Sequence, residues 1–115
     1  MASPRESLPS SYPVALNLHG RRCLVVGGGP VATGKVRRLV AAGAVIRLIA
    51  PTITQELAGL IAAATIDEHA AHEYRPSDLE GCAIAIAATN DRALNRLIAD
   101  DATAAGVLVN VVDSP

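Results

Sequence analysis

Aromatic side chains are scarce in this sequence. Its 115 residues include two Tyr but no Phe and no Trp. Proteins that bind single-stranded nucleic acids stack the bases on aromatic rings, so this composition argues against that class. A formal net charge of −1 also gives little attraction for DNA, RNA or an anionic membrane. We therefore expect no nucleic-acid partner and no membrane partner.

Cysteine and long apolar runs are also rare. The two cysteines, Cys23 and Cys82, form no Cys-x-x-Cys pair, which favours buried structural thiols. The sequence has no run of 18 apolar residues and no apolar signal core near its start, so we expect a soluble cytoplasmic protein. His69 and His72 would point to opposite faces of a strand, and their acidic neighbours match no known ligand spacing, so we expect no metal site.

Small aliphatic residues make up most of the apolar half of the chain. They suit a parallel sheet that helices cover on both faces. Alternating strands and helices predict an α/β fold, a Rossmann-like doubly wound parallel sheet of about five strands in the order 3-2-1-4-5. Strands are expected at residues 22–26, 45–50, within 66–74, 83–88 and 107–112. Helical segments are expected at 30–42, from the cap at residues 52–55 to about 64, at 76–79, and between the cap at 89–91 and Gly106.

The first 13 residues differ in composition from the rest of the chain. Residues 1–13 contain three Pro and four Ser and are expected to form a flexible tail, whereas residues 14–115 are expected to form one domain.

Thr52 and Gln55 have the spacing of a capping box for the second helix. Arg47 lies in the middle of the second strand and is expected to point to solvent.

The most informative feature is the junction between the first strand and the first helix. Gly27, Gly29 and Ala32 form a Gly-x-Gly-x-x-Ala pattern, which is typical of dinucleotide-binding turns. Gly27 allows a sharp turn, Gly29 allows a pyrophosphate to approach the main chain, and Ala32 allows close packing. The helix then presents unpaired N–H groups to the phosphates. Taken alone, the pattern also fits a tight strand–helix turn in any α/β protein.

Ligands of such sheets bind beyond the carboxyl ends of the strands, at the switch point between strands one and four. Residues 27–32, 50–52 and 88–91 should therefore meet there, with Asp113 arriving from strand five. An NAD site usually has an acid about 20 residues beyond the glycines, on the ribose hydroxyls, but residues 49–52 are Ile-Ala-Pro-Thr. From the residues alone, the choice between NAD and NADP stays open.

Three blocks of sequence together resemble the precorrin-2 dehydrogenase family, the N-terminal module of siroheme synthase. They are Leu-His-Gly-Arg-Arg-Cys-Leu-Val-Val-Gly-Gly-Gly-Pro-Val-Ala at 18–32, Ala-Ala-Thr-Asn-Asp at 87–91 followed by Leu94 and Asn95, and Val-Asn-Val-Val-Asp-Ser-Pro at 109–115. The resemblance implies NAD⁺-dependent oxidation of precorrin-2, a tetrapyrrole, to sirohydrochlorin in siroheme or cobalamin biosynthesis. Some members of this family are also ferrochelatases.

The resemblance also implies roles for particular residues. Asp113 matches the family's functional aspartate, and a carboxylate near the nicotinamide suits the removal of a proton during dehydrogenation. The position of Asp113 alone equally fits a solvated carboxylate or a helix cap. The implied contacts to NAD are Gly27, Gly29, Pro30, Val31, Pro51, Thr52, Thr89 and Asn90.

Family members continue beyond the point that matches Pro115 into a region through which two chains form a dimer. We therefore expect a homodimer or a partner chain to supply that region, and the 115-residue chain to be incomplete for catalysis by itself. The alternative interpretation is a non-catalytic module that binds NAD(H) and serves a regulatory or partner-subunit role.

Overall fold

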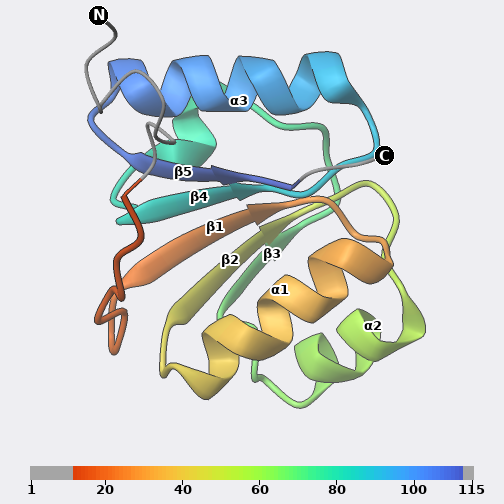
Figure 1. The fold of residues 1–115 in the computed structure, drawn as a ribbon. Coiled ribbons are helices and arrows are strands. Elements are labelled where there is room, and N and C mark those ends of the chain that lie inside the picture. The colour runs from red at the N-terminus through yellow and green to blue at the C-terminus, as the bar shows by residue number, and fades with distance from the viewer. Residues whose placement is uncertain (1–11, 113–115) are drawn as a thin grey trace, which may run out of the picture.

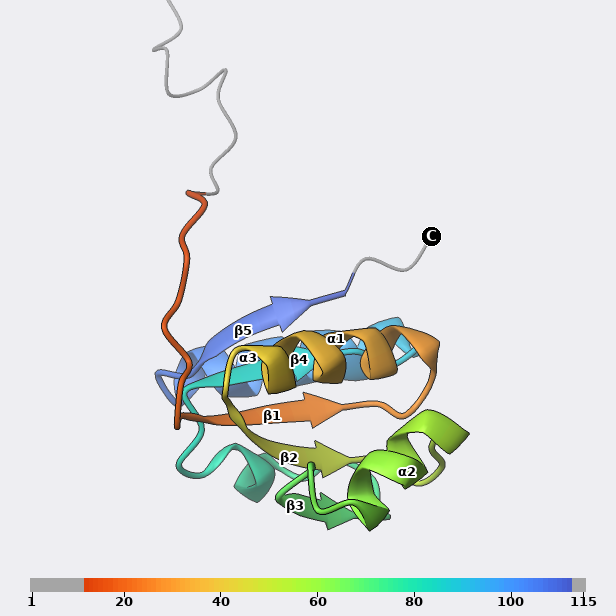
Figure 2. The same cartoon turned by 90° about the horizontal axis from the view of Figure 1, so that it is seen from below.

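The structure is a computed structural model that describes residues 12–112. Its centre is a five-stranded sheet in the order β3-β2-β1-β4-β5, in which each pair of neighbouring strands is parallel. This confirms the predicted α/β class and strand order. Residues 12–17 form no helix or strand and lead away from the sheet (Figure 2). Of the expected tail, residues 1–11 lie outside the described residues.

The observed elements agree with the expected ones to within a few residues. They are β1 (Arg22–Val26), α1 (Pro30–Ala41), β2 (Val45–Ile49), α2 (Gln55–Ala62), β3 (Glu68–Ala70), the 3-10 helix η2 (Pro76–Leu79), β4 (Ile84–Ala87), α3 (Arg92–Ala104) and β5 (Leu108–Val111). Within residues 12–112, no helix has the length and apolarity needed to cross a membrane.

Two apolar clusters lie on opposite faces of the sheet. Helices α1 and α2 cover one face, and α3 covers the other (Figure 1). On the first face Val36 and Leu57 pack against Val25 and Ile46, and on the second Ile98 and Ala102 pack against Leu24. Strand β1 contributes alternately to both clusters, as a central strand covered on both faces should. The layers therefore leave the carboxyl ends of the strands free to form a site.

The caps of two helices fix the loops at that end of the sheet. Asp91 is the N-cap of α3, where its Oδ1 accepts hydrogen bonds from the N–H groups of Ala93 and Leu94. The expected capping box beginning at Thr52 is wrong. The N-cap of α2 is Thr54, whose Oγ1 accepts a hydrogen bond of 3.2 Å from the N–H of Leu57. Thr52 is thereby left in the loop before the helix.

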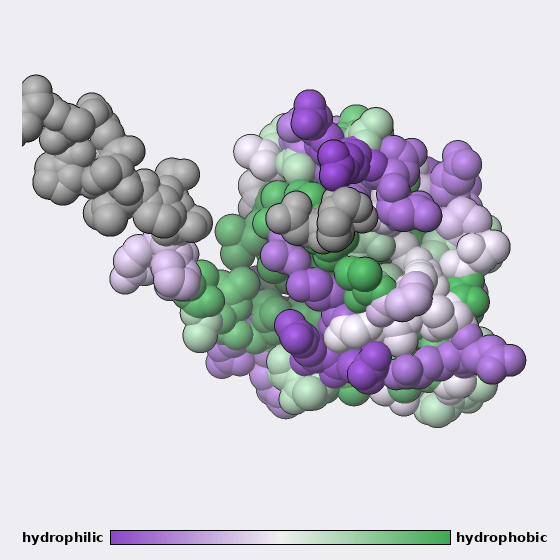
Figure 3. Space-filling model, turned by 45° about the vertical axis from the view of Figure 1, so that its right-hand side comes forward, coloured by the Kyte–Doolittle hydropathy of each residue, from purple (hydrophilic) through white to green (hydrophobic). Residues whose placement is uncertain are grey.

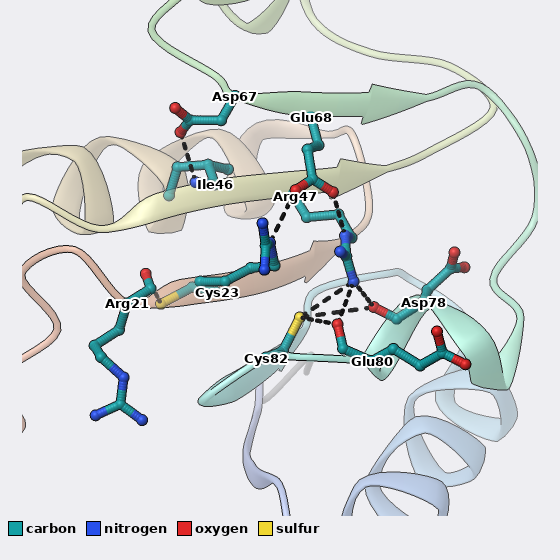
Figure 4. A network of polar contacts seen from close by, with 10 residues as sticks. Arg21, Cys23, Ile46, Arg47, Asp67, Glu68, Asp78, Glu80 and Cys82 are labelled. Atoms are coloured by element: carbon teal, nitrogen blue, oxygen red, sulfur yellow. Dashed lines mark hydrogen bonds and ion pairs between the residues drawn. The ribbon is translucent and has the colours of Figure 1, made fainter.

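The expectation that Arg47 points to solvent is also wrong. Its side chain is only 17% exposed, and its Nε lies 2.6 Å from Oε2 of Glu68. Its Nη1 donates to the carbonyl oxygens of Asp78 and Glu80 at 2.7 and 2.8 Å (Figure 4). A guanidinium has several donors in a fixed plane, so this one group joins β2 to β3 and to the segment around η2.

Glu68 links three strands through its carboxylate. Its Oε1 accepts a hydrogen bond of 2.8 Å from Nε of Arg22 on β1, in addition to the bond from Arg47. Hydrogen bonding from Arg47 is the main reason that the pKa of Glu68 lies below its ordinary value of 4.5. The sequence did not predict this network, because Arg22, Arg47 and Glu68 come from three separate strands.

The two cysteines are free thiols. Cys23 is fully buried, as expected, and Cys82 is half-buried, with its Sγ 3.5 Å from Nη1 of Arg47. Burial is the main cause that raises the pKa of each thiol. The two side chains belong to apolar clusters on opposite faces of the sheet.

We predict that Glu68→Gln lowers the free energy of unfolding by about 1 kcal/mol at neutral pH, because the ionic part of two hydrogen bonds is lost. A group with a lowered pKa stabilises the fold above its ordinary pKa and loses that contribution as the pH falls. The deficit should therefore shrink below pH 4.5. Urea unfolding at several pH values measures this loss of stability, with Glu80→Gln as the control. A loss that stays constant with pH would contradict the role of the Glu68 carboxylate as a charged acceptor.

Candidate functional site

A cleft of about 850 Å³ lies at the carboxyl ends of the strands. That volume is in the range of small-molecule and cofactor sites. Figure 3 brings this edge of the sheet forward and shows apolar and polar surface side by side on it. The lining consists of Val26, residues 27–31, residues 49–54, Glu73, Tyr74, residues 88–91, Leu94, Leu97 and Val112.

Gly27 brings the end of β1 against the end of β4. Its φ is +128°, a conformation that L side chains rarely adopt. A Cβ on Gly27 would lie 2.4 Å from the carbonyl oxygen of Ala88. Any side chain here would therefore push the two strand ends apart, and the predicted turn at Gly27 requires glycine for both reasons.

Gly28 performs the corresponding function toward the loop after β2. A Cβ on Gly28 would lie 1.9 Å from the carbonyl oxygen of Thr52, and the carbonyl oxygen of Gly28 accepts a hydrogen bond of 2.9 Å from the N–H of Thr54. The sequence pattern leaves this position unspecified, so Gly28 was missed. Its only signal was the third glycine within the run.

Gly29 differs from both neighbours because its missing side chain leaves open space. No atom lies within 4 Å of a Cβ built on it, and its φ of −89° is ordinary for any residue. Gly29 is the N-cap of α1, and Pro30 follows at the first helical position. Packing within the fold thus does not require glycine here, and the open space leaves room for a ligand to approach the main chain.

The first turn of α1 provides hydrogen-bond donors to the cleft. The main-chain hydrogen bonds of the helix begin with the N–H of Thr33, which donates to the carbonyl oxygen of Gly29 at 2.9 Å. The N–H groups of Val31 and Ala32 have no hydrogen-bond partner within the described part of the chain. No acidic side chain lies in this turn. Such a helix start favours an anion, through its free N–H groups and its dipole.

The loop after β4 is held rigid by one buried amide. Asn95 is 3% exposed, and its Oδ1 accepts hydrogen bonds from the N–H and the Oγ1 of Thr89 at 3.2 and 2.6 Å. Its Nδ2 donates to the carbonyl oxygen of Thr89 at 3.0 Å. The hydroxyl of Thr89 is thus engaged in shaping the loop, while the neighbouring Asn90 lines the cleft.

The side chains that line the cleft include no Lys and no Arg among the described residues. Two carboxylates, those of Glu73 and Asp91, lie on its wall. An anionic ligand would therefore meet no positively charged side chain of the described lining, and its hydrogen-bond donors would be main-chain N–H groups and neutral side chains such as Thr52 and Asn90. No group of three or more His, Cys, Asp or Glu side chains within residues 12–112 is placed to hold a metal ion.

The predicted site residues come together in this cleft, with one exception. Gly27, Gly29, Pro30, Val31, Pro51, Thr52, Thr89 and Asn90 all line it. Asp113 lies outside the described residues, although Val112 before it lines the cleft. Glu73 and Tyr74 were missed, because the residues alone did not locate the end of β3 within 66–74.

Three comparisons relate this chain to known proteins. The model of a protein family described as "Putative NAD(P)-binding" matches residues 14–115. Siroheme synthase of Nitrosomonas europaea is 47% identical over 103 residues, which are 90% of this chain and 22% of the relative. Siroheme synthase of Chromobacterium violaceum is 48% identical over 102 residues, 89% of this chain and 22% of the relative.

A solved structure, that of SirC, precorrin-2 dehydrogenase, is similar in fold and sequence. It superposes with a TM-score of 0.76 at 31% identity, over 91% of this chain and 51% of that chain. The present chain therefore spans about a fifth of the length of the curated relatives and about half of this structural neighbour.

We predict opposite outcomes for two adjacent substitutions. Gly28→Ala should lower the free energy of unfolding by about 2 kcal/mol, because its Cβ collides with a main-chain carbonyl, whereas Gly29→Ala should leave stability nearly unchanged. Urea unfolding of the two variants measures this difference. Equal stability of the two would show that the loop after β2 does not press against Gly28.

Proposed function

This chain belongs to the NAD(P)-binding family whose model matches residues 14–115, and we propose that it is the NAD-binding domain of a precorrin-2 dehydrogenase. The proposed reaction is the NAD⁺-dependent oxidation of precorrin-2 to sirohydrochlorin. The observation that carries the proposal is the start of α1, where open space at Gly29 adjoins two main-chain N–H groups without partners. The similarity to siroheme synthases and to SirC supports the choice of reaction.

The residues present fit a dinucleotide. The pyrophosphate would lie over Gly29, against the N–H groups of Val31 and Ala32, because both the free space and the free donors are there. Pro51 and Thr52 would contact one half of the ligand, and Thr89 and Asn90 the other, since they lie at the ends of β2 and β4 on either side of β1.

The charge of the cleft favours NAD over NADP. A 2′-phosphate is usually met by an Arg near the end of β2, but no basic side chain lines the described cleft. Arg47, the nearest candidate in the sequence, is engaged with Glu68 and with two carbonyl oxygens on the segment around η2. The 2′-phosphate of NADP would therefore find no counter-charge.

NAD⁺, when bound, supplies the acceptor for the hydride that leaves the substrate. We propose that Asp113 accepts the accompanying proton or orients the carbon that loses the hydride. The chain order supports this role, because Asp113 directly follows Val112, which lines the cleft. The tetrapyrrole would bind next to this end of the cleft.

Complete activity requires more than this domain in our proposal. The chain spans only 22% of the siroheme synthases that it matches. We propose that a homodimer or a partner chain contributes surface around the substrate. We place the protein in the cytoplasm with its tetrapyrrole substrate.

We predict that Gly29→Val folds normally but binds NAD⁺ about a hundredfold more weakly or not at all, because a branched side chain fills the space over the free N–H groups. Titration calorimetry measures the affinity, and circular dichroism checks the fold. The matched control is Gly34→Val, since Gly34 also faces open space but lies outside the cleft. Unchanged affinity of Gly29→Val would exclude this turn as the pyrophosphate site.

We predict that Asp113→Asn leaves NAD⁺ affinity unchanged but lowers turnover of precorrin-2 by about 10²–10⁴-fold, the usual contribution of a general base. Turnover is to be measured as NADH formation in a protein extended to the length of its relatives. Full turnover by Asp113→Asn would contradict its role. Absence of turnover in the extended unsubstituted protein, with NAD⁺ binding intact, would favour a non-catalytic NAD(H)-binding module.

A further inference from the structure

The loop between β3 and η2 reaches the same end of the sheet as the loop after β2. Strand β3 pairs with the carboxyl-terminal half of β2, with Ile49 opposite Ala70. The N–H of Ala50 continues the pairing by donating to the carbonyl oxygen of Ala70 at 3.2 Å. The residues that follow β3 therefore emerge at the same edge of the sheet as residues 50–52, and Glu73 and Tyr74 among them line the cleft.

This loop is braced from several directions. The phenol of Tyr74 donates a hydrogen bond of 2.8 Å to Oδ2 of Asp101 on α3, and burial followed by this bond raises the pKa of Tyr74. The N–H of Arg75 donates to Oδ2 of Asp78 at 2.8 Å. Nδ1 of His72 lies 2.7 Å from the carbonyl oxygen of Glu73. The main chain of Glu73 is thus fixed on both sides at the edge of the cleft.

The side chain of Glu73, in contrast, has no partner. Within the described residues its carboxylate accepts no hydrogen bond and forms no ion pair. The other carboxylate on the cleft wall, that of Asp91, already caps α3 through its Oδ1. Glu73 therefore places a free anionic acceptor on a braced loop at the β2–β3 side of the cleft.

We propose that the Glu73 carboxylate binds the hydroxyl groups of the adenosine ribose and thereby selects NAD over NADP. This inference rests on the proposed function. The ribose acid of a dinucleotide site normally stands at the end of β2, and this places the adenosine ribose near that strand end. Here that position is occupied by Ala50, Pro51 and Thr52, and a free carboxylate of the cleft wall, that of Glu73, comes from the loop after the neighbouring strand β3 instead.

The chemistry of Glu73 suits both parts of this role. A carboxylate has two oxygens that accept hydrogen bonds and can meet two vicinal hydroxyls. A phosphate on the 2′-oxygen removes one donor and adds negative charge beside the carboxylate, which is repulsive. No basic side chain lines the described cleft to offset that repulsion.

The test is a set of calorimetric titrations of the 115-residue chain with NAD⁺ and NADP⁺. We expect the unsubstituted chain to prefer NAD⁺. Glu73→Ala should weaken NAD⁺ binding about tenfold, as expected for hydrogen bonds to a charged group, and should reduce the preference. Glu73→Arg should reverse it, because a guanidinium would pair with the 2′-phosphate. The matched control is Glu80→Ala, which removes the same charge outside the cleft.

The outcomes separate this inference from the function on which it rests. If the unsubstituted chain binds neither dinucleotide, the proposed function fails. If the chain binds NAD⁺, but Glu73→Ala and Glu73→Arg keep the same ratio of NAD⁺ to NADP⁺ affinity as Glu80→Ala, the role of Glu73 is overturned and the proposed function stands.

Discussion

The close approach of three strand ends around residues 27–29 is the constraint on which the site depends. Gly27 and Gly28 contact the loops after β4 and β2 so tightly that a Cβ on either would lie within 2.4 Å of a carbonyl oxygen. These contacts fix where α1 begins, and so fix where its first N–H groups lie. Gly29 can then face open space, because the contacts of Gly27 and Gly28 already fix the position of the main chain before it.

The electrostatics of the cleft follow from this arrangement. Charged side chains do not attract an anion there, because the only charged side chains in the described lining are the carboxylates of Glu73 and Asp91. The start of α1 supplies it instead, through N–H groups fixed by the fold. Arg47, the arginine nearest the end of β2 in the sequence, is engaged in structure instead, because it holds β2, β3 and the segment around η2 together.

The sequence was sufficient to predict the strand order, most element bounds and the eight residues that meet in the cleft. The strand order, the bounds and the meeting of residues 27–32, 50–52 and 88–91 rest on local patterns, namely apolar runs, helix-start signals and glycine spacing, and on one general rule for parallel sheets. The choice of the eight residues within those segments rests on the resemblance to the precorrin-2 dehydrogenase family. The contacts of Arg47 and Glu68, and the position of Glu73, arise between segments distant in sequence, so no local pattern carried them. Thr54 took the cap expected of Thr52 because α2 starts later than the capping-box spacing implied.

Amide chemical-shift mapping by NMR, with NAD⁺ added to the 115-residue chain, tests the central claim most directly. We predict saturable shifts concentrated in residues 27–32, 50–52 and 88–91, the three segments that meet at the strand ends. Saturation with shifts confined to another face of the sheet, or no shifts at millimolar NAD⁺, would contradict it.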